Sequence, residues 1–167
     1  MKEKALQKGS TVFLRAAVLA IGGIVLALCV FALPALWTSV DGDKEYGDIA
    51  YAFYWIVGLL YAGAIPFFYA LYQSLKLIGY IDTNKAFSKA SVRALKRIAW
   101  CGVVIAVLFA AMEPWLYVWA EHDDAPGVIL FGMIIAGASL TISVFAAVLQ
   151  RLLSQAIDIK KENDLTV

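Results

Sequence analysis

Four long apolar runs constrain the fold of this 167-residue chain more than any other feature of its sequence. Three cover residues 16–40, 49–75 and 125–150, and the fourth starts at residue 98 and continues past Glu113 to residue 120. About 20 apolar residues are enough for a helix to cross the hydrocarbon core of a bilayer. A membrane β-barrel would instead show alternating segments of about ten residues, which the sequence lacks. The runs therefore predict an all-α membrane protein with four transmembrane helices.

The composition agrees with this class, because 62% of the residues are hydrophobic and only 16% are charged. An ordinary soluble domain has roughly 45–50% apolar and about 25% charged residues. The first run is too long for the apolar core of a signal peptide, roughly 7–15 residues, so we expect it to stay as a membrane helix. We predict a single domain over residues 1–167, folded as an antiparallel up-and-down bundle. Its expected spans are about 12–37, 49–75, 98–120 and 126–150.

The charged residues predict the orientation of these spans. Residues 76–97 carry six Lys and Arg against one acidic residue, and residues 1–15 carry four against one. Residues 41–48 carry four acidic residues against one Lys, and residues 113–124 carry four acidic residues and no Lys or Arg. Lys and Arg are retained on the cytoplasmic side of a membrane. We therefore predict a protein of the bacterial inner membrane with both termini in the cytoplasm.

The sequence offers no recognisable catalytic or metal site. The chain has one His and two Cys, and Cys29 and Cys101 are expected at different depths in the membrane, too far apart for a disulfide. We expect two free thiols and no zinc site. The acidic stretch 121–124 lacks the spacing of a calcium loop and is predicted to be a solvated turn. No nucleophile pairs with a base, so we predict no enzymatic activity and no cofactor.

Glu113, followed by Pro114, is the chemically unusual residue of the spans. An ionisable side chain inside a span is a candidate functional site, and a proline inside a helix leaves the carbonyl one turn earlier without a donor. Glu113 lies late in its helix, so we favour a carboxylate that reaches the outer headgroups. The alternative is a proton or cation site that faces the interior of the bundle.

Three other patterns concern packing and the cytoplasmic segments. Small residues recur at three- or four-residue steps in the last span and predict a face for close helix packing: Gly132, Ala136, Ser139, Ser143 and Ala147.

Residues 88–97, which Ser88 is expected to cap, form an amphipathic helix that leads into the third span, with a basic face suited to anionic lipid. The basic residues sit in no nucleic-acid recognition fold, so we predict contact with the bilayer and no direct nucleic-acid binding. The apolar periodicity of the last span continues into a helical tail over residues 151–163.

Two motifs resemble the bacterial domain-of-unknown-function family numbered 2975. The stretch "AFSKASVRALKRIAW" holds the Phe-Ser and basic Leu-Lys-x-Ile pattern of that family. The stretch "QAIDIKKENDLTV" holds its closing Glu-Asn-Asp-Leu-Thr-Val pattern. The resemblance implies a small four-helix inner-membrane protein without an established activity. It also implies an association with a cytosolic helix-turn-helix regulator, because such genes often neighbour those of the family.

These motifs predict a docking element in the cytoplasm. The tail would dock on the 88–97 helix of the same chain or on a cytosolic partner, and the candidate residues are Phe87, Ser88, Leu95, Lys96, Glu162, Asn163, Asp164, Leu165 and Val167. The function that follows is a non-enzymatic membrane regulator or sensor. A small transporter or channel that uses Glu113 and a structural subunit of a membrane complex remain as alternatives. Self-association of the chain also remains open.

Overall fold

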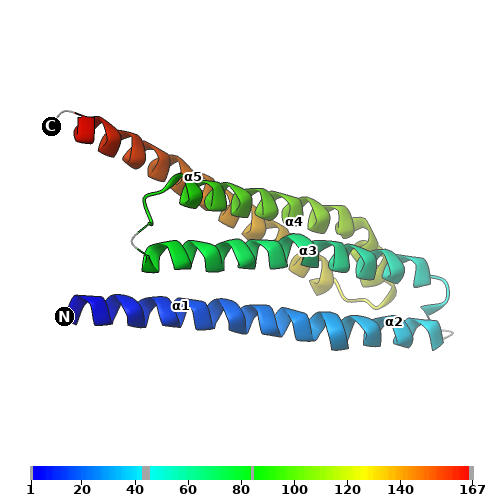
Figure 1. The fold of residues 1–167 in the computed structure, drawn as a ribbon. Helices are drawn as coiled ribbons and strands as arrows, with labels where there is room; N and C mark the ends of the chain where they lie inside the picture. The colour runs from blue at the N-terminus through cyan, green and yellow to red at the C-terminus, as the bar shows by residue number, and fades with distance from the viewer. Residues whose placement is uncertain (1, 43–45, 84, 166–167) are drawn as a thin grey trace.

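The computed structural model describes residues 2–42, 46–83 and 85–165, and the regular structure of these residues is helical (Figure 1). The first span consists of three consecutive segments, α1 (Lys2–Ala27), the π-helical η1 (Leu28–Ala32) and α2 (Leu33–Gly42). We call these segments together the N-terminal rod. The helices α3 (Ala50–Asp82), α4 (Lys89–His122) and α5 (Gly127–Leu165) follow. The start of α1 and the end of α5 lie at the same end of the molecule (Figure 1).

The predicted fold class is confirmed. Four helical segments are long and apolar enough to cross a membrane, and they cover Thr11–Thr38, Ala50–Asp82, Lys89–His122 and Gly127–Asn163. The amphipathic segment 89–97 is the first part of α4, and the tail is the last part of α5. Ser88 caps α4 as predicted, because its hydroxyl oxygen accepts a hydrogen bond from the backbone N–H of Ser91 at 3.3 Å.

The tightest packing in the bundle lies between α4 and α5. A Cβ atom on Gly102 would lie 2.9 Å from the backbone carbonyl oxygen of Ser139 and 2.9 Å from the Cβ of Ser143. The Ser143 hydroxyl, which is buried, donates to the backbone carbonyl of Ala99 at 2.6 Å. Small residues let membrane helices approach closely, and hydroxyl groups then bond across the contact. α4 also packs along α3, whereas the N-terminal rod packs mainly on α3.

The π-helical segment η1 ends two residues before Pro34. Within η1 the hydrogen bonds shift to a five-residue step, so that the backbone N–H of Leu33 donates to the carbonyl of Leu28. In this register the carbonyl of Cys29 would accept from residue 34, but Pro34 has no N–H. The Tyr61 hydroxyl of α3 donates to the Cys29 carbonyl instead, at 2.9 Å. One side chain of α3 thus satisfies the backbone group that the proline leaves open.

Candidate functional site

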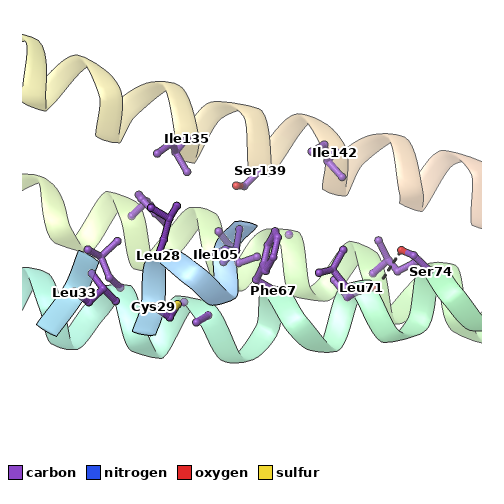
Figure 2. Close-up of a pocket in the computed structure, with 18 of the residues that line it drawn as sticks. Leu28, Cys29, Leu33, Phe67, Leu71, Ser74, Ile105, Ile135, Ser139 and Ile142 are labelled. Carbon is purple, nitrogen blue, oxygen red and sulfur yellow. Dashed lines mark hydrogen bonds between the residues drawn. The ribbon is translucent and has the colours of Figure 1, made fainter. Parts of the chain in front are cut away.

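A cavity lies between the N-terminal rod and the helices α3, α4 and α5. It measures about 590 Å³, and we call it the central cavity. Figure 2 shows Leu28, Cys29 and Leu33 on the side of the rod and Ile135, Ser139 and Ile142 on the side of α5. Side chains of α3, such as Phe67 and Leu71, and of α4, such as Ile105, complete the lining. Every membrane helix therefore contributes to one apolar space.

The cavity exists because the rod does not close against α4 and α5. The rod packs mainly on α3, and the residues of α3 that face the cavity include the small Gly63 and Ala64. The hydroxyls of Ser74 and Ser139 are the polar side-chain groups of the lining, apart from the Cys29 thiol, and Ser74 donates to the backbone carbonyl of Ala70 at 2.9 Å. The cavity is thus suited to an apolar molecule.

The central cavity is partly open to the surroundings of the molecule. An apolar cavity offers too few hydrogen-bond partners to hold ordered water. Its lining is therefore compatible with apolar material such as a lipid acyl chain.

Glu113 points inward, so the expectation that its carboxylate reaches the outer headgroups is wrong. Both carboxylate oxygens are buried and have no hydrogen-bond partner among the residues that the structure describes. A Cβ atom on Gly132 of α5 would lie 2.5 Å from Oε1, so the carboxyl group occupies the space that this glycine leaves. The buried Met112 and Leu116 flank Glu113 on α4. The physical reason is the rotation of α4, which turns this face toward α5.

Asp123 organises the end of α4 near the acidic turn. Its Oδ2 accepts from the indole N–H of Trp119 at 2.7 Å and from the Tyr46 hydroxyl at 3.5 Å. Its Oδ1 lies 3.0 Å from Nδ1 of His122. The hydrogen bonds from His122 and then Trp119 lower the pKa of Asp123 below its ordinary value. The turn is exposed as predicted, but Asp123 also ties α4 to the segment before α3.

The residues proposed for docking lie in two separate places. On the α4 side Phe87 and Lys96 are exposed, Leu95 is buried and Ser88 caps the helix. On the α5 side residues 158–163, which include Glu162 and Asn163, are exposed, and the end of α5 extends beyond the start of α4 (Figure 1). The side chains of Asp164 and Leu165 and the whole of Val167 lie outside the described residues. The described part of the tail is therefore exposed to solvent.

The residues proposed for helix packing lie on α5. Gly132 and Ser143 are buried, whereas Ala136, Ser139 and Ala147 are partly buried. Gly132 is close to Glu113, and Ser143 is bonded to Ala99 of α4. The free thiols are confirmed: Cys101 is buried, and Cys29 is partly buried in the wall of the cavity.

Sequence reasoning missed Tyr61 and Pro34. Pro34 was visible near the end of an apolar run, and a proline there signals a backbone carbonyl that needs another donor. That the donor would be Tyr61 depends on how α3 lies beside the rod, which the sequence does not contain.

The comparisons with known proteins agree with the membrane architecture. The family described as "Protein of unknown function (DUF2975)" matches residues 37–167, and therefore the greater part of the chain. The uncharacterized membrane protein YoaS of Bacillus subtilis (strain 168) is 53% identical over 158 residues, which cover 95% of this chain and 98% of YoaS. No solved structure matches the chain. This four-helix integral membrane protein therefore belongs to the DUF2975 family.

Proposed function

We propose that the protein is a non-enzymatic membrane sensor in which the content of the central cavity controls the cytoplasmic end of α5. The observation that carries this proposal is the continuity of α5 from Gly127 to Leu165. Its membrane part lines the cavity through Ile135, Ser139 and Ile142. Its last part, residues 158–163, is exposed. One helix thus contacts both the apolar site and the surface that a partner would bind.

The length of α5 supports a mechanical link. A helix of 39 residues is about 58 Å long at 1.5 Å per residue. The hydrocarbon core is about 30 Å thick, so nearly half of α5 extends beyond it. Because an unbroken helix moves as a unit, a tilt imposed at Ser139 displaces the exposed end. A ligand shifts such an equilibrium only by its different affinity for the two positions of the helix.

The partner that we propose is a cytosolic helix-turn-helix regulator. The positive charge of residues 76–97 supports a cytoplasmic position for the exposed end of α5. The family resemblance supports the class of partner. Leu165 and Val167 would supply apolar contacts, whereas Glu162 and Asp164 would pair with Lys or Arg of the regulator.

A cavity-filling variant tests the link between the cavity and the tail. Ala64→Phe places a ring in the cavity, and Ala110→Phe, at an exposed position of α4 that does not line the cavity, is the matched control. The readouts are the rate of tail proteolysis in inverted vesicles and the capture of the regulator by the detergent-solubilised protein. We expect Ala64→Phe to change both and Ala110→Phe to change neither. If Ala64→Phe behaves like the wild type while the bundle stays folded, the cavity does not control the tail.

The tail itself is tested by Leu165→Asp in the full-length chain. We expect this variant to lose capture of the regulator, because an apolar contact is replaced by a charge, and to keep the stability of the bundle. Burial of one leucine contributes roughly 1.5–3 kcal/mol, which corresponds to at least about a tenfold loss of affinity. Unchanged capture by Leu165→Asp would show that the tail is not the docking element.

A transport role of Glu113 is the second candidate function, and the buried carboxylate favours it. An ionised carboxylate without a partner is very costly in an apolar surrounding, so the neutral acid fits the observed environment. Such a group can take up and release a proton when the α4–α5 contact changes. Proton flux into proteoliposomes should then be lost in Glu113→Gln. Equal flux with the wild type and Glu113→Gln would exclude this role.

A further inference from the structure

A second hollow lies on a different face of the molecule, between α3 and α4. We call it the α3–α4 groove; it measures about 420 Å³ and shares no lining residue with the central cavity. Its lining on α3 consists of Ile65, Pro66 and Tyr69. On α4 it consists of Arg97, Trp100 and Val104, with the Cys101 thiol between them. Arg97 is the single charged residue of this lining.

The cationic end of the groove forms no ion pair with the side chains that the structure describes. Lys76 lies beyond Tyr69 on α3, with its Nζ 4.6 Å from the centre of the Tyr72 ring, and the charge of Arg97 acts on it. Among the described side chains, ion pairs join Arg15 to Asp82 and His122 to Asp123. Neither Arg97 nor Lys76 takes part in one. Arg97 and Lys76 are thus two exposed cations without a carboxylate partner among the described side chains.

The groove changes character along its length. Trp100, three residues after Arg97, is 63% exposed. The opposite end of the groove is aliphatic, and Ile65 there is 74% exposed. Arg97 and Val104 are seven residues apart, or about 10 Å along the helix. The order of cation, amphipathic rings and aliphatic side chains matches the order of phosphate, glycerol and acyl chain in a phospholipid. Tryptophan and tyrosine favour the same headgroup level.

We propose that the α3–α4 groove binds one anionic phospholipid, whose phosphate is held by Arg97 and Lys76 and whose acyl chain lies along Ile65 and Val104. Basic pockets between transmembrane helices bind the headgroups of anionic lipids by this chemistry. The site belongs to the leaflet that faces residues 76–97, which we expect to be cytoplasmic. It does not depend on the sensor function proposed above, because the central cavity contributes nothing to it.

The charge is tested by native mass spectrometry of the full-length protein in detergent. The probes are phosphatidylglycerol and phosphatidylcholine with identical acyl chains. We expect the wild type to prefer phosphatidylglycerol and Arg97→Gln to bind it about fivefold more weakly, the effect of one basic residue near an anionic surface. Arg93→Gln is the matched control, because Arg93 is exposed on α4 but does not line the groove. Equal binding of both lipids to the wild type, or an equal loss in Arg93→Gln, would overturn the proposal.

The shape of the groove is tested without a change of charge. Val104→Phe fills the aliphatic end, and Val107→Phe adds the same ring at an exposed position outside the groove. We expect Val104→Phe to weaken phosphatidylglycerol binding and Val107→Phe to leave it at the wild-type level. If both variants bind phosphatidylglycerol like the wild type, the acyl chain does not lie in the groove and the proposed site is wrong.

Discussion

Replacement of Gly102 by alanine should weaken the α4–α5 contact, although alanine is the better helix former. The new Cβ would lie 2.9 Å from the Ser139 carbonyl oxygen and 3.3 Å from the Cα of Ser143. Ordinary contacts of a Cβ atom begin near 3.4 Å, so the helices must separate by about 0.5 Å. Because two of the neighbouring atoms belong to the backbone, no change of rotamer relieves the overlap.

The expected magnitude follows from two opposing terms. Overpacking destabilises a close contact by about 1–3 kcal/mol, whereas the change from glycine to alanine stabilises a helix by at most about 1 kcal/mol. We therefore expect Gly102→Ala to lower the free energy of unfolding by about 1–2 kcal/mol. Gly137→Ala on α5 is the matched control, because a Cβ atom there meets nothing within 4 Å, and it should be neutral or slightly stabilising.

The assay is reversible unfolding of the full-length protein in mixed detergent micelles, followed by circular dichroism. The two variants have the same composition, so their difference isolates the contact of residue 102. If Gly102→Ala is as stable as Gly137→Ala, α5 does not approach α4 as closely as described.

Three further predictions concern topology, pH and the rod. Reporter fusions after Lys85 and at the C-terminus should report cytoplasm, and a fusion near Asp123 should report the outside; the reverse pattern would contradict the charge argument. Because hydrogen bonds lower the pKa of Asp123, its carboxylate stabilises the fold above the ordinary aspartate pKa of about 3.9. This contribution is lost as the pH falls through the lowered pKa. Acid unfolding followed by tryptophan fluorescence should therefore lose this pH dependence in Asp123→Asn. Tyr61→Phe should lower the free energy of unfolding by about 1 kcal/mol. The loss should be smaller in a Pro34→Ala background, because the alanine restores a backbone N–H. Equal losses of stability in both backgrounds would refute the role of Tyr61 at the Cys29 carbonyl.

The sequence was sufficient for the features that depend on local composition. The length of the apolar runs predicted the four spans, and the hydroxyl of Ser88 before a helical pattern predicted the start of α4. Both features depend on residues that are close in the chain. They therefore do not require knowledge of how the helices pack.

The candidate sites depend on packing between distant helices, and here sequence reasoning was incomplete. The direction of Glu113 depends on the rotation of α4 and on the space left by Gly132, 19 residues later in the chain. The central cavity combines residues from every span, from Val25 to Ile142. No periodicity within one helix contains this information. The groove around Arg97 likewise appears only when α3 and α4 are placed side by side.

The attachment of the N-terminal rod mainly to α3 determines how the molecule should respond to mechanical force. The rod packs mainly on α3, whereas α4 is held between α3 and α5. When a single molecule is pulled from its N-terminus, the first rupture should release residues 2–42 and leave α3, α4 and α5 folded. Relaxation of the force should return the rod in one step, with Tyr61 as its point of attachment. The released length would thus measure the rod as an independent mechanical unit.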